Sequence, residues 1–316
     1  MVCALSLSWT IEILQALNPT RTSSLLDVAT NILGACIGVA IALFIKHQST
    51  KRSGIIRWFD NHCQNQNSLY LGVITLFIWM MAELGPFFPS FDNDILHHGV
   101  APLTMVASAH NPLSWADLAY STASLITLAV ILKLTLKLKH PLLVFNVLVI
   151  VVLCLKIPVI GRQLHPEPIA ALVCTNAILL YLNTRTQRRW FGLSITFVAL
   201  LIDGLRPFQF DITTGKIFNW DMLRAQILHP LGLVDILKQM WLVFAACFFI
   251  NHYQTTSLDK IRNWGALCVF AIFLVVEFAQ TRILGRFPDI TDAIIPVLAW
   301  YIAVLIPRYR LHPHTG

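Results

Sequence analysis

Two segments of the chain carry the same four polar residue types at the same spacing, 265 residues apart. The first segment holds Glu12, Gln15, Arg21 and Asp27, and the second holds Glu277, Gln280, Arg286 and Asp292. An arginine between two carboxylates can form a salt-bridged clamp, and its parallel N–H donors can instead hold the phosphate or carboxylate of a ligand. A glutamate in such a cluster can also act as a general acid or base. The residue types alone leave these three chemistries open.

The composition predicts that these residues lie in a membrane. Of the 316 residues, 12% are charged and 56% are apolar, whereas a soluble domain carries roughly 25% charged residues. The apolar residues come in blocks of about 20, the length of a helix that crosses the hydrocarbon core. We therefore expect an all-α, polytopic transmembrane protein with about ten transmembrane helices, and we exclude soluble enzymes and DNA-binding proteins. The seven scattered cysteines show no metal-ligand spacing, so we expect no bound metal or cofactor.

The expected membrane spans are 2–17, 24–45, 69–88, 114–136, 141–157, 168–184, 190–207, 229–251, 264–281 and 290–307. Lysine and arginine concentrate in every second connection between these spans, whereas the connection 89–113 contains neither residue. Because basic residues stay on the cytoplasmic side, both termini are expected in the cytoplasm. The net charge of +7 then reflects topology and contact with membrane lipids rather than with nucleic acid.

Two connections are predicted to lie at the membrane surface. The segment 218–228 has helical spacing of apolar residues after Asn219, a suitable N-cap, which indicates a short surface helix. The segment 99–109 is apolar but too short to cross, so it either enters the membrane partway or packs on it. Histidines and aspartates flank it and could form a solvated loop or a metal site. They are His97, His98, His110, Asp92 and Asp94.

Helix periodicity predicts how the charged residues meet. Glu12 and Gln15 are three residues apart and share one helix face near the outer end of the first span. Arg21 follows in the turn, and Asp27 lies in the first turns of the next helix, where the helix dipole favours an anion. Each segment is therefore expected to be a helical hairpin that holds an arginine between two carboxylates, because unpaired charges are costly in a bilayer.

The first segment also continues its polar face with small residues. Asp27, Asn31, Gly34 and Gly38 share one helix face, and the two glycines allow another helix to approach closely. The pattern E-x-x-Q, P-x-R or G-R, then D-x-x-x-N-x-x-G-x-x-x-G resembles the signature hairpin of VanZ-like membrane proteins. Glu12, Gln15, Pro19, Arg21, Asp27, Asn31, Gly34 and Gly38 match it, and Glu277, Gln280, Arg286 and Asp292 match its charged half.

In that family the hairpin is the second half of a four-helix unit, whose first helix commonly has Pro-Phe near its outer end. By resemblance, 190–310 is one whole unit, in which Asp203 and Arg206 precede this Pro-Phe, and 1–45 is the second half of another. The segment 69–189 is interpreted as a degenerate copy of the unit: its Pro-Phe lies 121 residues before the matching pair, and its Gly161-Arg162 lies 124 residues before. The chain would then begin in the middle of a unit.

The degenerate copy departs from the motif at three positions, where it has Leu153, Lys156 and Pro168. Lys156 is therefore expected to form a different ion pair, with Glu167. The candidate site residues are the four motif residues of each hairpin and Asn31. Arg162, Asp203 and Arg206 are secondary site residues.

The resemblance implies a bacterial cytoplasmic (inner) membrane protein of the cell envelope, in a family linked by its name-giving members to reduced susceptibility to teicoplanin. The first hypothesis is a non-catalytic protein that binds or helps to handle a lipid-linked envelope precursor or an anionic lipid head group. The alternative is a structural or assembly component of an envelope polysaccharide or secretion system. An intramembrane enzyme using Glu12 or Glu277 is the third, although no nucleophile elbow, metal-ligand run or phosphate loop accompanies these residues.

Overall fold

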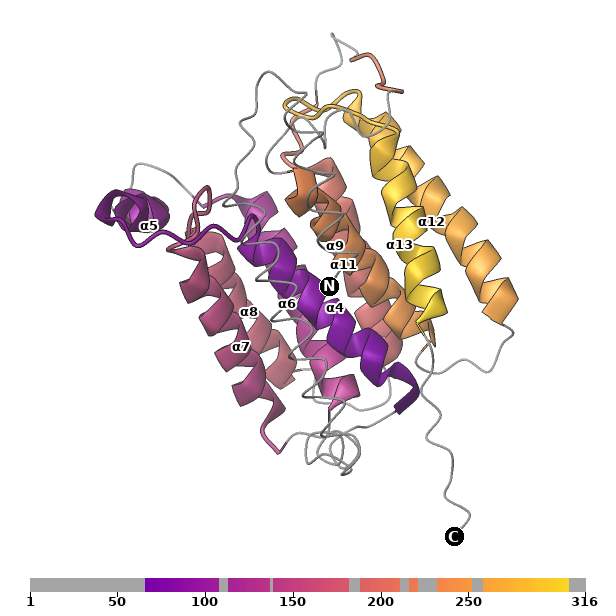
Figure 1. Cartoon of the computed structure of the whole chain (residues 1–316), viewed down its shortest axis with the longest axis horizontal. Helices are drawn as coiled ribbons and strands as arrows, with labels where there is room; N and C mark the ends of the chain where they lie inside the picture. Colours follow the sequence, from indigo (N-terminus) through magenta and orange to yellow (C-terminus); the bar gives the residue numbers. More distant parts are fainter. Residues whose placement is uncertain are drawn as a thin grey trace, which may run out of the picture. The chain divides into compact units, whose positions relative to one another are not determined.

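The structure, a computed structural model, describes residues 66–107, 113–136, 139–181, 188–210, 216–220, 232–251 and 258–306. Apart from isolated backbone bridges, these residues form only helices and turns (Figure 1). The helices are α4 (Gln66–Leu84), α5 (Asn93–Ala107), α6 (Trp115–Thr135), α7 (Pro141–Lys156), α8 (Pro166–Tyr181), α9 (Arg188–Leu205), α11 (Gly232–Asn251), α12 (Leu258–Gln280) and α13 (Thr291–Leu305). The predicted spans 2–17 and 24–45, and with them Glu12, Gln15, Arg21, Asp27 and Asn31, lie outside the described residues.

The other eight expected spans coincide with helices, with boundaries within about six residues. As helices they are confirmed. Three of them are long and apolar enough to cross a membrane: Trp115–Thr135 in α6, Val234–Asn251 in α11 and Arg262–Gln280 in α12. The apolar stretches of the remaining helices are shorter than 18 residues, and α4 and α9 end just before the cis prolines Pro86 and Pro207.

Local sequence explains where several helices begin. Ser114 is the N-cap of α6, and its hydroxyl accepts a hydrogen bond from the backbone N–H of Asp117 at 3.3 Å. Pro141 occupies the first turn of α7, where a missing N–H costs nothing. Asp235 and Asp292 lie in the first turns of α11 and α13, where the positive end of the helix dipole stabilises a carboxylate.

The core is formed by α6 and α11, which are surrounded by other helices. α4 packs against α11, α9 packs against α6, and α8 and α13 pack on α6 and α11 respectively. Leu128 and Ile131 of α6 and Trp241, Phe244 and Phe248 of α11 are almost completely buried. Helices that are apolar on all sides are expected in such interior positions.

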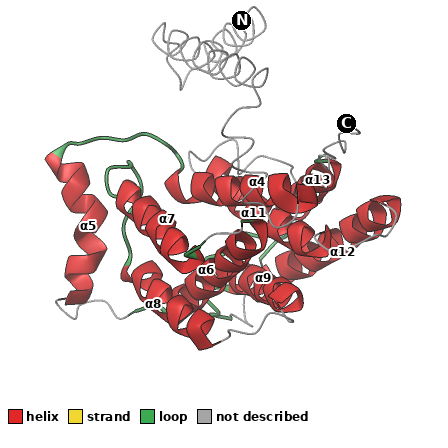
Figure 2. Cartoon of the chain, turned by 90° about the horizontal axis from the view of Figure 1, so that it is seen from below, coloured by secondary structure: helices red, strands yellow, loops and turns green. Residues whose placement is uncertain are grey.

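The helix α5 lies across the direction of the other helices (Figures 1 and 2). It is longer than the apolar segment 99–109 that the sequence indicated, because it begins at Asn93. It contacts the turn after α7: the backbone N–H of Leu164 donates to the carbonyl of Gly99 at 2.8 Å. A Cβ atom at Gly99 would lie 2.4 Å from the carbonyl oxygen of Ile157, so a glycine is needed for this close crossing.

Candidate functional site at two equivalent helix corners

The helices α4 and α9 end in the same way. The peptide bonds before Pro86 and Pro207 are cis, and the following residues, Phe87 and Phe208, have positive φ angles of 64° and 61°. The chain therefore leaves each helix abruptly. The last carbonyl groups of a helix have no intrahelical partner, so these two ends present acceptors that another part of the protein must satisfy.

In the C-terminal half of the chain, Arg286 satisfies these acceptors. Its Nε donates to the carbonyl of Arg206 at 2.9 Å, and its Nη2 donates to the carbonyl of Asp203. The expectation that Arg286 lies as a fork between Glu277 and Asp292 is therefore corrected, because the guanidinium faces backbone oxygens of α9 instead. The negative end of the α9 dipole and its open carbonyls compete successfully for the cation.

Arg162 makes the same contacts with α4. Its Nε donates to the carbonyl of Gly85 at 2.5 Å, and its Nη2 donates to the carbonyl of Ala82 at 2.8 Å. Both acceptors lie 121 residues before those of Arg286, and the arginine lies 124 residues before. The two arginines therefore perform one structural task in two places, which is to join the end of one helix to the turn after another.

The backbone around the two arginines also matches. Gly161 and Gly285 have the same φ of 76°, a conformation that favours glycine, and no atom lies within 4 Å of a built Cβ, so the backbone rather than the space demands glycine. The turns are joined to the helix ends by the isolated bridges Pro89–Val159 and Phe210–Ile283. We call residues 82–90 with 156–164 the middle corner, and residues 203–210 with 280–288 the C-terminal corner.

The two corners differ in the side chains beside the arginine. Gln280 Nε2 donates to the carbonyl of Gly204 at 3.0 Å. A Cβ atom at Gly204 would lie 2.3 Å from Val276, so α9 and α12 approach closely here. At the equivalent positions, the middle corner has Glu83 and Lys156, which form an ion pair. A neutral hydrogen bond to the backbone in one corner is thus replaced by two opposite charges in the other.

The expected pair between Lys156 and Glu167 is wrong. Glu167 instead accepts a hydrogen bond from the backbone N–H of Ser114 at 3.0 Å, through its Oε1. Lys156 lies at the end of α7, beside the end of α4, so Glu83 is the carboxylate within reach. The sequence spacing within one hairpin could not show this partner on another helix.

Glu277 organises the entry to α13. Its Oε2 accepts a hydrogen bond from the backbone N–H of Asp289 at 2.9 Å, and the side chain is almost completely buried. The Oδ1 of Asp289 accepts in turn from the backbone N–H of Thr291 at 2.8 Å, and its Oδ2 accepts from the amide of Asn219 at 2.9 Å. Asp292 follows in the first turn of α13. The residue types of the motif are thus used to fix the backbone of the hairpin.

Asp203 and Arg206 connect α9 to α6. Arg206 pairs with Asp203 at 2.5 Å and with Asp117 at 2.9 Å, and its guanidinium lies 4.3 Å from the ring centroid of Tyr120. Sequence reasoning identified Asp203 and Arg206 but missed Asp117. An acidic residue inside an expected span was the available signal, since such residues mark polar partners in membrane helices.

Lys216 was also missed. Its Nζ donates to the carbonyls of Ile283 at 2.8 Å and Arg286 at 2.5 Å, and its backbone N–H donates to the carbonyl of Thr281 at 3.1 Å. This lysine therefore satisfies the carbonyls of the C-terminal corner from outside. The segment 216–220 is extended where it is described, with a bridge from Asn219 to Asp289, and the rest of the surface helix expected at 218–228 lies outside the described residues.

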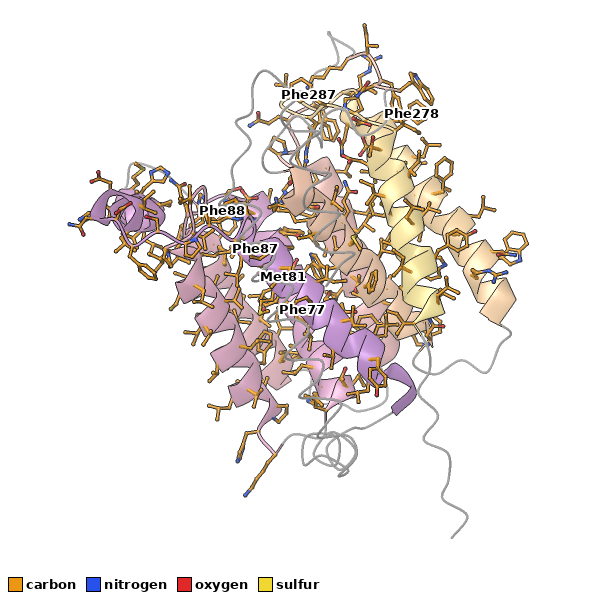
Figure 3. The ribbon with its side chains drawn as sticks, in the orientation of Figure 1. Phe77, Met81, Phe87, Phe88, Phe278 and Phe287 are labelled. Carbon is orange, nitrogen blue, oxygen red and sulfur yellow. The ribbon has the colours of Figure 1, made fainter. Side chains whose placement is uncertain are left out.

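Aromatic side chains surround both corners. Figure 3 shows Phe87 and Phe88 at the end of α4, and Phe278 and Phe287 at the end of α12. Phe88 and Phe287 are strongly exposed, at 65% and 82%. Exposed aromatic rings gather at the boundary between membrane and water, where an apolar ring and a polar surrounding are both available. The corners have the composition of such a boundary.

The arrangement can hold an anion more readily than a metal ion. Across the described parts of the chain, no group of three or more His, Cys, Asp and Glu residues is placed to hold a metal, and His98 contacts Gln163 at 3.0 Å. Each corner arginine uses Nε and Nη2 for the backbone and is only partly buried. Its remaining N–H groups are suited to an oxyanion.

Comparison with known proteins does not identify what the corners bind. No family model matches the chain, and neither a curated protein nor a solved structure matches it. What the corners can bind therefore follows from their donors, their charge and their surroundings.

Proposed function

We propose that the chain is a multi-pass bacterial cytoplasmic membrane protein, VanZ-like, that binds the anionic head group of a membrane lipid or lipid-linked envelope precursor. Three helices with the length and composition of membrane spans support the location. The exposed aromatic residues at the corners support a position at the membrane surface. Lys133 and Lys139 mark the opposite end of the bundle, so the corners face the periplasm.

The proposed architecture is an internal repeat of VanZ-like four-helix units at 69–189 and 190–310, preceded by half a unit at 1–45. The matching corners support the repeat, because they share their backbone contacts at constant offsets. The helix packing supports it as well. α4 corresponds to α9 and α6 to α11, and each first helix packs against the second helix of the other unit: α4 with α11, and α9 with α6. This exchange indicates an approximate two-fold relation between the units.

The orientation of Arg286 is the observation that carries the head-group proposal. The carbonyls of Asp203 and Arg206 accept hydrogen bonds from its Nε and Nη2. These two backbone contacts fix the guanidinium, and no carboxylate is needed on its Nε–Nη2 edge. The Nη1 group and the second Nη2 hydrogen then form a parallel pair of donors that matches a phosphate. Fixing the guanidinium in advance lowers the entropy cost of binding. Arg162 presents the same arrangement in the middle corner.

The test compares two ligands that differ only in the phosphate group. Purified full-length protein in detergent is mixed with a polyprenyl phosphate or with the corresponding polyprenol, and binding is measured by native mass spectrometry. We expect the phosphate to bind at least tenfold more tightly, which corresponds to about 1.4 kcal/mol. Equal binding of the alcohol and the phosphate would contradict the proposal, and this comparison needs no substitution.

Two variants then locate the binding site. Arg286→Lys keeps the charge but loses the parallel donors, so phosphate binding should fall although the cation remains. Lys139→Gln is the control, because it removes an exposed cation just before α7, at the end of the bundle opposite to both corners. Loss of binding in both variants alike would indicate general attraction to charge rather than recognition at the corner.

A second candidate function is a structural or assembly component of an envelope polysaccharide or secretion system. The observation that favours it is the use of Glu277, Gln280 and Arg286 for backbone contacts within the protein itself. Under this function, variants at the corner should lose activity only in proportion to the loss of folded protein. Quantifying protein in the membrane alongside the phenotype separates the two candidates.

A further inference from the structure

The C-terminal unit contains an apolar cavity of about 440 Å³ between α9, α11, α12 and α13. Its size lies in the range of about 300–1,000 Å³ that small-molecule sites occupy. All four helices contribute side chains, and the lining is almost entirely hydrocarbon and aromatic. Representative lining residues are Leu193, Leu200, Val243, Val269, Phe273 and Trp300.

Thr196 and Trp300 bring polar groups to the lining, and both groups are already bonded. The hydroxyl of Thr196 donates to the carbonyl of Gly192 at 2.7 Å, and the indole N–H of Trp300 donates to the carbonyl of Arg262 at 3.2 Å. A buried water needs two to four polar partners, which this cavity does not offer. Its chemistry therefore suits a hydrocarbon occupant rather than water.

Two of the positions that line the cavity carry larger side chains in the middle unit. With the offsets of the corners, Leu200 corresponds to Trp79 and Val269 to Phe145, and both larger side chains are buried, at 3% and 1% exposed. Beside Phe145 there is a cavity of only about 40 Å³, lined by α6, α7, α8 and Phe191 of α9. The C-terminal unit thus has smaller side chains at these two positions, and its α12 packs on α13, whereas α7 makes few contacts with α8.

The position of the cavity indicates what fills it. Two of its walls, α11 and α12, are candidate membrane spans, and Trp264 and Cys268 line it while remaining exposed, so it opens beside α12. Leu200 lies three residues before Asp203, and Phe273 lies four residues before Glu277. At 1.5 Å per residue, one end of the cavity is about one helical turn from the C-terminal corner.

We infer that this cavity holds one hydrocarbon chain of a membrane lipid whose anionic head group lies at the C-terminal corner. The inference rests on the proposed function for the head group, and on the cavity for the chain. Two contacts then define the ligand, because Arg286 selects the charge and the space between Leu200 and Val269 accepts the chain. The middle corner has the arginine without the cavity, so it lacks the second contact.

Photo-crosslinking tests the position of the chain. Full-length protein in phosphatidylcholine nanodiscs receives phosphatidylglycerol that carries a diazirine in one acyl chain, and labelled residues are mapped by mass spectrometry. We expect labels on cavity residues around Cys268 and Trp300. The double variant Leu200→Trp with Val269→Phe, and the milder Val269→Phe alone, should reduce this labelling, roughly tenfold for the double variant, because the new side chains exclude several methylene groups.

The control is Leu267→Phe, which adds the same ring on the exposed side of α12, where labelling of the cavity should not change. Because the filling residues are those that the middle unit already uses, the variants are expected to fold, and thermal unfolding checks this. Labels confined to outward-facing residues, or cavity labels that survive in a folded double variant, would overturn the inference.

The same experiment separates the chain site from the head-group site. A phosphatidylcholine probe with the same diazirine chain is compared with the phosphatidylglycerol probe. Equal cavity labelling by both would support the chain site and contradict the anionic head-group proposal. A preference for phosphatidylglycerol with labels outside the cavity would support the head-group proposal and overturn the chain site.

Discussion

The middle and C-terminal corners place different side chains on the same backbone. In both, an arginine after a glycine of positive φ binds the last carbonyls of a helix that ends at a cis proline. Beside it, the middle corner has the Glu83–Lys156 ion pair, whereas the C-terminal corner has Gly204 and Gln280. Both corners therefore share the arginine that binds the helix-end carbonyls. The two positions beside the arginine differ between the corners, and they differ together as a pair.

The interiors of the two units differ in a similar way. Trp79 and Phe145 are buried in the middle unit, whereas the equivalent Leu200 and Val269 line a cavity in the C-terminal unit. Likewise, Leu153 occupies the position of Glu277 and is buried as an ordinary apolar residue. The C-terminal unit thus has the charged hairpin and the cavity, whereas the middle unit has apolar side chains at the equivalent positions.

The largest expected effect comes from removing one charge of the Glu83–Lys156 ion pair, which the C-terminal corner lacks. Glu83→Gln leaves the buried Lys156 without its carboxylate, which should destabilise the protein by about 3 kcal/mol. The double variant Glu83→Gly with Lys156→Gln, which copies the C-terminal corner, should recover most of this loss. Thermal unfolding of the purified protein measures these variants together with the single variants Glu83→Gly and Lys156→Gln. A double variant as unstable as the sum of its single variants would show that the two positions do not form a pair.

The next effect tests the equivalence of the arginines. Arg162→Met and Arg286→Met each leave two helix-end carbonyls without a charged donor, so each should cost about 2–4 kcal/mol of unfolding free energy. Arg282→Met is the control, because Arg282 is exposed on the same turn as Arg286. Strong destabilisation at only one of the two corners would contradict their structural equivalence.

The sequence predicted much of the fold because apolar blocks of helical length are a strong local signal. It also predicted the relation between Gly161-Arg162 and Gly285-Arg286, since glycine and arginine are distinctive types at a constant offset. It did not predict what these arginines bind. Backbone carbonyls are present at every residue, so the acceptor role of Asp203 and Ala82 leaves no mark in the sequence.

Partners on distant helices were equally hidden. Arg206 pairs with Asp117, which lies 89 residues earlier in the chain. Lys156 pairs with Glu83 rather than with Glu167, which is nearer to it in sequence. Spacing rules describe neighbours on one helix or hairpin, whereas these pairs depend on how helices are placed together. The cavity was hidden for the same reason, because it results from the combined sizes of residues on four helices.

A smaller effect tests the difference between the interiors. Phe145→Val opens space in the filled unit and should cost about 1–3 kcal/mol, whereas Val269→Phe occupies existing space and should change stability by less than about 1 kcal/mol. Thermal unfolding of both variants in the same detergent provides the measurement. If Val269→Phe proved the more harmful, the space beside it would have to be smaller than the structure shows.

The smallest effect comes from an ion pair outside the buried contacts. Lys238 lies 3.1 Å from Asp235 one helical turn away, and the aspartate side chain is 60% exposed. Exposed pairs of this kind contribute about 0–1 kcal/mol, because water screens the charges and the side chains lose freedom when they pair. Lys238→Gln should therefore barely change thermal unfolding, whereas Glu83→Gln should change it strongly. A large loss in Lys238→Gln would mean that Lys238 also stabilises Glu83 through the field of its charge, which the double variant Lys238→Gln with Glu83→Gln would reveal as non-additivity.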